Sequence, residues 1–147
     1  MEIERKFLIN TLPSDLENYP CHRIEQAYLC TNPVIRVRRQ DDDYILTYKG
    51  SGMMVREEYN LPLTAEAYAH LLPKADGNIL TKKRYVIPLF DGLNIELDIF
   101  EGKFAGLQMA EVEFPDESTA NSFPVPDWFG EEVTWNPAYH NSNMSRV

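Results

Sequence analysis

Charged side chains recur at every second residue along several segments of the chain. Seven acidic and seven basic residues share this spacing, which begins at the N-terminus with Glu2-Ile-Glu4-Arg-Lys6. Because alternate side chains of a β-strand point to opposite faces, each segment places its charges on one face. The fourteen residues are Glu2, Glu4, Lys6, Arg36, Arg38, Lys49, Arg56, Glu58, Lys82, Arg84, Glu96, Asp98, Glu111 and Glu113. This spacing predicts a sheet with one strongly ionic face.

An ionic face is, in the simplest interpretation, the face that an antiparallel sheet turns to water. A solvent face usually mixes Thr, Ser, Gln and Lys, whereas this one carries charges on nearly every expected strand. The opposite face has the composition of a core: Ile35, Val37, Tyr44, Leu46, Tyr48, Ile95, Leu97, Ile99, Val112 and Phe114. We therefore expect the charged residues to line an enclosed space.

Turn residues divide the chain into elements that predict a mainly β, α+β fold. Strands are expected at residues 2–9, 23–30, 34–39, 44–49, 54–61, 79–88, 93–100 and 107–114. Short helices are expected at 64–72, with Thr64 as the N-cap, and through about Asn121, with Asp116 as the N-cap. Prolines break the remaining tail into turns and short helical pieces. Eight antiparallel strands of this kind predict a closed β-barrel with a few short flanking helices and a ligand in its interior.

Length and charge limit the classes of protein to which the chain can belong. A chain of 147 residues has the size of one domain, which we expect to span residues 1–147. No apolar run approaches the roughly 18 residues of a membrane span, and the strand pattern begins at Glu2 without the apolar core of a signal peptide, so we expect a cytoplasmic protein without a membrane partner. A net charge of -9 argues against a nucleic-acid partner. Cys21 and Cys30 have no metal or redox spacing, and we expect them to be reduced and partly buried.

An enclosed set of charges requires partners, because burying an ion costs several kcal/mol unless it is paired. Seven of the 14 Lys and Arg residues fall in the expected lining, so the interior is balanced while the exterior is acidic. A multiply charged anion accompanied by divalent cations would pair with charges of both signs. The spacing therefore indicates a small polyanion as the ligand.

The ordered motifs resemble the CYTH superfamily, also called the triphosphate tunnel metalloenzymes. The opening Met-Glu-Ile-Glu-Arg-Lys-Phe-Leu is similar to the Glu-x-Glu-x-Lys signature of that family. It is followed, in the family's order, by Ile35-Arg-Val-Arg38, Leu46-Thr-Tyr-Lys-Gly50, Arg56-Glu-Glu58, Lys82-Lys-Arg-Tyr85, Glu96-Leu-Asp98 and Glu111-Val-Glu113. The tail resembles the end of the short bacterial members in Trp128-Phe-Gly-Glu-Glu-Val-Thr134 and Tyr139-His-Asn141. The resemblance covers nearly the whole chain.

This resemblance implies a closed eight-stranded tunnel that binds a linear triphosphate with Mg²⁺ or Mn²⁺. On that basis the expected metal ligands are Glu2, Glu4, Glu111 and Glu113. The expected phosphate-binding residues are Lys6, Arg36, Arg38, Lys49, Arg56, Lys82 and Arg84. The remaining inward carboxylates would support these groups or orient the attacking water, and they are the expected catalytic residues: Glu58, Glu96 and Asp98.

The expected activity is the metal-dependent hydrolysis of inorganic tripolyphosphate to pyrophosphate and orthophosphate, as in the short bacterial inorganic triphosphatases. A small domain leaves little protein to grip a base or a thiamine, which favours the bare triphosphate. Nucleoside triphosphatase, thiamine triphosphatase and class IV adenylate cyclase are the enzymatic alternatives, and a polyphosphate-binding module is the non-enzymatic one. The oligomeric state and the number of metal ions stay open.

Some positions depend on weaker arguments. Glu58 is preferred over Glu57, because Glu57 lies on the mostly apolar side of its strand. Lys82 is preferred over Lys83 because Lys82 and Arg84 are two residues apart and so share one face. The three histidines match no metal motif and are expected to be solvent-exposed or structural: His22, His70 and His140. Two polar residues of the 23–30 strand are expected either to contact the ligand or to pack: Gln26 and Tyr28.

Overall fold

The computed structural model describes all residues, 1–147, as a mainly β protein with short helices. The strands are β1 (Glu2–Ile9), β2 (Cys21–Thr31), β3 (Val34–Gln40), β4 (Asp43–Lys49), β5 (Val55–Arg56), β6 (Glu58–Pro62), β7 (Asp76–Pro88), β8 (Asn94–Phe100), β9 (Gln108–Glu113) and β10 (Phe129–Glu132). The helices are α1 (Ala65–Leu71), α2 (Glu117–Asn121) and α3 (Asn141–Met144). Short 3₁₀ turns are η1 (Leu16–Asn18), η2 (Leu72–Lys74), η3 (Phe90–Gly92), η4 (Gly102–Phe104) and η5 (Pro137–Tyr139).

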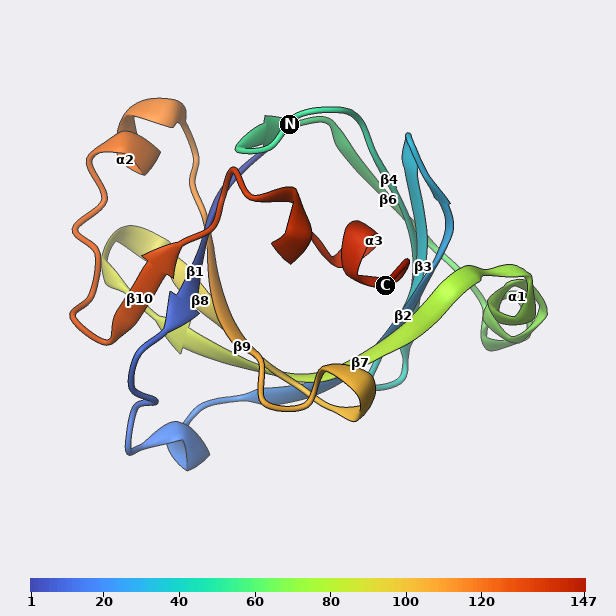
Figure 1. Cartoon of the computed structure of the whole chain (residues 1–147), viewed down its shortest axis with the longest axis horizontal. Coiled ribbons are helices and arrows are strands. Elements are labelled where there is room, and N and C mark those ends of the chain that lie inside the picture. Colours follow the sequence, from blue (N-terminus) through green and yellow to red (C-terminus); the bar gives the residue numbers. More distant parts are fainter.

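The sheet is antiparallel throughout and curls into a barrel (Figure 1). Its order is β10-β1-β9-β8-β7-β2-β3-β4-β6, and β5 pairs with β1. The predicted strand 54–61 is interrupted at Glu57, so that β6 pairs with β4 while Val55 and Arg56 pair with Ile3 and Glu2 to close the ring. If β5 and β6 are counted as one interrupted strand, the ring has the eight strands that the sequence predicts.

The tail contains a strand that the sequence analysis did not predict. β10 pairs with Phe7 and Ile9, at the end of β1 that β5 leaves free. The prolines that flank it favoured turns in the sequence, but the unpaired edge of β1 offers hydrogen-bonding groups that a short strand can satisfy. The two helix caps are as predicted: Thr64 accepts a hydrogen bond from Ala67 N at 3.0 Å, and Asp116 accepts one from Thr119 N at 2.7 Å.

The apolar core lies mainly outside the barrel wall, because the interior is charged. On one side, Phe7, Leu97 and Val112 pack beneath Phe123 and Phe129 from the segment that carries α2 and β10. On another side, α1 covers β3 and β4 through Tyr68, which packs with Val37. Three residues predicted to belong to the core are only partly buried and join none of the core clusters: Ile35, Tyr48 and Ile99.

The C-terminal segment, residues 133–147, closes one end of the barrel. Tyr28, Leu80 and Met109 from the inner wall pack there against Val133 and Met144. In Figure 1, α3 lies within the outline of the ring, close to the C-terminus. The cavity of the barrel is therefore blind at this end.

The C-terminal segment is seated on a glycine of β7. Gly77 has a φ of +73°, and a Cβ at this position would overlap the carbonyl oxygen of Ser145. That oxygen accepts a hydrogen bond from the backbone N–H of Asn78. Only glycine therefore combines the backbone conformation with the close approach of the segment.

Two other expectations concern the surface. Cys21 and Cys30 are both free, as predicted, but they are exposed rather than partly buried. Both lie towards the ends of β2, Cys21 at its first residue and Cys30 one residue before its last. None of the helices has the length and apolar composition needed to cross a membrane.

Candidate active site in the barrel

The interior of the barrel contains a cavity of about 280 Å³ whose lining is almost entirely polar. Only 3 of its 22 lining residues are hydrophobic. Thirteen of the fourteen charged residues predicted to face inward line it, and the exception is Asp98. The choices of Glu58 over Glu57 and of Lys82 over Lys83 are confirmed. The alternating pattern therefore identified the inner face of nearly every strand.

The two signs of charge lie mainly on different strands, although Lys6 lies on β1 with Glu2 and Glu4. The carboxylates of β1, β8 and β9 are brought side by side by the register, in which Glu4 lies opposite Glu113 and Glu96 lies opposite Glu111. The arginines and lysines come mainly from β3, β4, β5 and β7: Arg36, Arg38, Lys49, Arg56, Lys82 and Arg84. An anion in the cavity would therefore meet cations on one side and acidic groups on the other.

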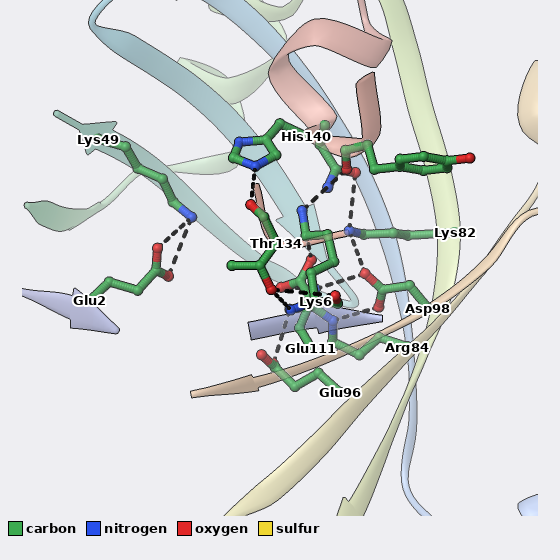
Figure 2. Close-up of polar contacts among 12 residues, drawn as sticks. Glu2, Lys6, Lys49, Lys82, Arg84, Glu96, Asp98, Glu111, Thr134 and His140 are labelled. Carbon is green, nitrogen blue, oxygen red and sulfur yellow. Dashed lines mark hydrogen bonds and ion pairs between the residues drawn. The ribbon is translucent and has the colours of Figure 1, made fainter. Parts of the chain in front are cut away.

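Asp98 is fully buried behind two of the cations and ties them together. Its Oδ2 lies 2.6 Å from Lys82 Nζ, and its Oδ1 accepts a hydrogen bond of 2.7 Å from Arg84 Nε. Figure 2 shows both side chains directed at this carboxylate. Burial acts to raise the pKa of Asp98, but the charges of Arg84 and Lys82 hold it below its usual value. Of the two roles expected for Asp98, support of the cations fits this location.

Lys82 is held in an environment that weakens its affinity for a proton. Burial lowers the pKa of Lys82 to about 7, and the charges of Arg84 and Arg38 act in the same direction. The charge of Asp98 opposes this shift. Burial and the charge of Arg36 likewise lower the pKa of Arg38 to about 9. The like charges on this side of the cavity therefore repel one another until an anion enters.

A second cluster lies at the seam where β5 closes the ring. Lys49 Nζ lies 3.1 Å from Glu2 Oε1 and 3.2 Å from Glu58 Oε2, and Figure 2 shows the contact with Glu2. Loss of hydration, the charge of Glu4 and a hydrogen bond with Glu58 raise the pKa of Glu2 to about 9. At Glu58, burial acts to raise the pKa, but the hydrogen bond with Glu2 and the charge of Lys49 lower it below its usual value. The pKa values of the two carboxyl groups are thus shifted in opposite directions beside the lysine.

Three arginines of the cavity have no carboxylate partner. They are Arg36, Arg38 and Arg56. The Nε atoms of Arg36 and Arg56 are buried without any hydrogen-bond partner. Because an unsatisfied buried donor is unfavourable and guanidinium can only donate, these atoms are available to an anion.

Two carboxylates have no cation partner. Glu4 and Glu113 are opposite one another on β1 and β9, and Glu113 is exposed at the mouth of the cavity. Loss of hydration and the charge of Glu111 raise the pKa of Glu4 to about 7. Burial and the charges of Glu58 and Glu96 also raise the pKa of Glu113. A positive charge between Glu4 and Glu113 would stabilise the ionised form of both carboxylates.

The donor set fits a hard divalent cation that keeps much of its water. No three carboxylate, imidazole or thiol groups converge on one point as a complete protein site would require. Mg²⁺, however, is commonly held by one or two carboxylates together with phosphate oxygens and water. Glu4 and Glu113 supply such a pair. The other two predicted ligands are engaged, since Glu2 contacts Lys49, and Glu111 lies 3.5 Å from Lys6 and 3.8 Å from Arg84.

The cavity also contains residues that the sequence analysis did not assign to it. Thr47 and Asn60 are hydrogen-bonded at 2.6 Å and follow the same alternation as Lys49 and Glu58, so the spacing contained the signal for both. Tyr28, left open between ligand contact and packing, lines the cavity and packs in the core. From the C-terminal segment come three residues whose position no local pattern indicates: His140, Asn141 and Ser142.

His140 has the structural environment that was one of the two expectations for the histidines, and it also lines the cavity. It is half-buried and faces the cavity, and its Nε2 lies 3.1 Å from the carbonyl oxygen of Thr134. Burial and the charge of Lys6 lower the pKa of His140, which favours the neutral ring. The position arises from the folding of the tail into the barrel, which the sequence pattern does not contain.

A closed antiparallel barrel that places unpaired arginines opposite unpaired carboxylates defines a class of protein: those that bind a multiply charged anion inside a β-barrel. The chain belongs to the CYTH domain family, whose model matches residues 1–145. It is 38% identical to an inorganic triphosphatase from Nitrosomonas europaea over 148 residues, covering 98% of this chain and 96% of that protein. It is 35% identical to an inorganic triphosphatase from Acetivibrio thermocellus, covering 97% and 92%.

A solved structure shares the fold over the same extent. The crystal structure of the inorganic triphosphatase NE1496 matches with a TM-score of 0.73 at 35% sequence identity, covering all of this chain and 95% of that one. The predicted family and the predicted barrel are thereby confirmed.

Proposed function

We propose that the protein hydrolyses inorganic triphosphate to pyrophosphate and orthophosphate inside the barrel, in a divalent-metal-dependent reaction. The observation that carries this proposal is the pairing, in one blind cavity, of three arginines without carboxylate partners and two carboxylates without cation partners. Relatives named inorganic triphosphatase, at 38% and 35% identity over nearly the whole chain, support it.

The cations would bind and orient the triphosphate. The guanidinium groups of Arg36, Arg38 and Arg56 can donate two hydrogen bonds each to phosphate oxygens, which gives direction as well as charge. Lys6, Lys49, Lys82 and Arg84, already paired with carboxylates, would add a surrounding positive potential. Phosphoryl transfer asks a protein mainly for positioning and charge stabilisation, and this lining supplies both.

The carboxylates would hold the metal and the attacking water. Glu4 and Glu113 are the proposed ligands of Mg²⁺ or Mn²⁺, with Glu2 and Glu111 beside them. When bound, the cation would neutralise phosphate charge and stabilise the charge that develops during transfer. Glu58 and Glu96 line the cavity and can accept a proton or a hydrogen bond from water, with Glu96 fixed by Arg84 at 3.0 Å.

The cavity favours a bare triphosphate over a nucleotide or thiamine triphosphate. Its lining has only three hydrophobic residues, so a base would find little surface on which to stack. The C-terminal segment closes the far end and leaves no second opening for a bulky group. The free cysteines suit the reducing cytoplasm that the sequence predicts, and the location stays a prediction.

Phosphate release from tripolyphosphate and from ATP, measured with Mg²⁺, with Mn²⁺ and with a chelator, tests this proposal. We expect kcat/KM for tripolyphosphate to exceed that for ATP by roughly ten- to a hundredfold, which requires only about 1.4–2.8 kcal/mol in the transition state. Activity should disappear with the chelator. A preference for ATP, or cyclic AMP among the products, would assign the protein to the nucleotide-specific alternatives. Tight binding of tripolyphosphate without phosphate release would indicate a binding module instead.

A further inference from the structure

One side chain of the C-terminal segment contacts a phosphate-facing lysine directly and a second cation through a buried glutamine. Asn141, the first residue of α3, lines the cavity floor. Its Oδ1 lies 3.2 Å from Gln26 Nε2 and 3.4 Å from Lys82 Nζ, and both of these nitrogens donate to it. Gln26, on β2, is fully buried.

The hydrogen bonds of Gln26 have only one consistent direction. Arg38 donates to Gln26 Oε1 from Nε at 2.8 Å and from Nη2 at 2.5 Å. Since a guanidinium has no acceptor, the oxygen of Gln26 must face Arg38 and its Nε2 must face the floor. There Asn141 must present its oxygen, because Gln26 and Lys82 are both donors. The order Arg38 to Gln26 to Asn141 is therefore a directed chain of hydrogen bonds.

This chain determines which donors remain for an anion. Arg38 has no carboxylate partner, and Gln26 is the neutral group that fixes its Nε edge. Lys82 is held by Asp98 at 2.6 Å on one side and by Asn141 on the other. Arg36, in contrast, is bonded to Thr47 in the barrel wall at 3.2 Å. The orientations of Arg38 and Lys82 thus depend on the C-terminal segment, whereas the orientation of Arg36 depends on the barrel wall.

We propose that Asn141 is a positioning residue for polyphosphate binding, which fixes Arg38 through Gln26 and holds Lys82 directly. The affinity for the anion then depends on how the C-terminal segment is seated in the barrel. This inference rests on the proposed function of the cavity as a triphosphate site.

A double-mutant cycle with Gln26→Met and Asn141→Ala tests this chain of hydrogen bonds. Gln26→Met keeps the buried volume while removing the amide. We expect each single variant to raise KM for tripolyphosphate roughly tenfold, the scale of one lost hydrogen bond to a charged group, with kcat changed less than about threefold. The double variant should fall well short of the product of the two effects, because both break one chain. Strictly multiplicative losses would overturn the proposal.

Asn143→Ala is the matched control on the same helix. Its Nδ2 donates to the carbonyl oxygen of Pro137 at 2.8 Å, and its side chain does not line the cavity. This variant should lower the stability of the segment and leave KM unchanged. If it raises KM as much as Asn141→Ala does, the segment acts only as a structural closure and the positioning role of Asn141 is excluded.

The Nε–H signal of Arg38 in a ¹H–¹⁵N spectrum of the unliganded protein separates this inference from the proposed function. We expect slow exchange with water in the native protein and in Asn143→Ala, and faster exchange in Gln26→Met and Asn141→Ala. If Asn141→Ala leaves the exchange slow, the chain of hydrogen bonds is not what fixes Arg38. If the native protein shows the expected exchange but does not hydrolyse tripolyphosphate, the proposed function fails while the positioning of Arg38 stands.

Discussion

Glu4 and Glu113 are the cavity carboxylates for which function and stability make opposite demands. Each lies among other acidic groups and has no ion pair, so in the metal-free protein its charge is unfavourable. The pKa of Glu4 is raised from 4.5 to about 7 in the folded protein. The folded state therefore holds a proton that the unfolded chain has lost, and stability falls as the pH rises through this window.

This sign gives a prediction for Glu4→Gln. In the presence of a chelator at pH 8, the variant should be more stable than the native protein, because it removes a carboxylate that is ionised in both states but unfavourable only in the folded one. The difference should nearly vanish at about pH 4.5, where Glu4 keeps its proton in the folded state. Urea unfolding at the two pH values measures it, and a variant that is destabilised at pH 8 would contradict the assignment.

The same variant should be almost inactive. Loss of a metal-binding carboxylate should reduce the metal-dependent rate by at least about 10²-fold, the scale of losing one electrostatic contact to a transition state. Glu17→Gln, an exposed carboxylate in η1, is the control and should alter neither the rate nor the stability at pH 8. A Glu4→Gln enzyme with near-native turnover would exclude Glu4 as a ligand.

At the residue scale, period-two spacing was sufficient to find the cavity wall but not its floor. Glu58 and Lys82 were chosen over their neighbours because a strand fixes parity, and the structure agrees. Alternation cannot tell which inward charges are already paired, since that depends on register. Only the register brings Asp98 against Lys82 and Arg84. His140 and Asn141 come from a segment without period, so no local pattern could place them.

At the scale of elements, the strands were predictable and the closure was not. Residues 2–9 alternate strongly and form β1 with the predicted bounds. The interruption at Glu57 depends on a long-range requirement, because β5 must reach the edge of β1 while β6 stays with β4. β10 likewise exists because β1 leaves an edge open. Such pairings join residues far apart in the sequence, and local strand propensity does not predict them.

Gly77 and Gly92 together test how the C-terminal segment is seated. Both have a similar positive φ, +73° and +75°, but a Cβ at Gly77 would overlap Ser145, whereas a Cβ at Gly92 would meet nothing within 4 Å. Gly92→Ala should therefore cost about 1 kcal/mol of unfolding free energy from backbone strain alone. Gly77→Ala should cost more, by up to about 3 kcal/mol, and should raise KM for tripolyphosphate. Urea unfolding and steady-state kinetics measure the two effects, and equal losses in both variants would show that the segment does not press on β7.

At the scale of the whole molecule, the charge is divided between the inside and the outside of the barrel. The chain has 23 acidic and 14 basic residues, and the fourteen inward groups comprise seven of each sign, so the net charge of -9 belongs to the rest of the molecule. An acidic exterior disfavours long polyanions such as nucleic acid. A short polyanion that enters the mouth meets the unpaired arginines instead.

Thermal unfolding in the presence of different anions tests this division. Tripolyphosphate with Ca²⁺, chosen to limit turnover, should raise Tm, because an anion that binds only the folded state stabilises it by about 2.7 kcal/mol at a hundredfold excess over Kd. For a domain of this size that corresponds to a rise of roughly 5–11 °C.

Orthophosphate, which cannot span the three arginines, should give a far smaller rise, and heparin should give none. Arg36→Met, which removes a buried and unpaired donor, should reduce the shift with tripolyphosphate. Equal shifts from orthophosphate and tripolyphosphate would show that the cavity does not measure the length of the anion, and a large shift with heparin would place the binding surface outside the barrel.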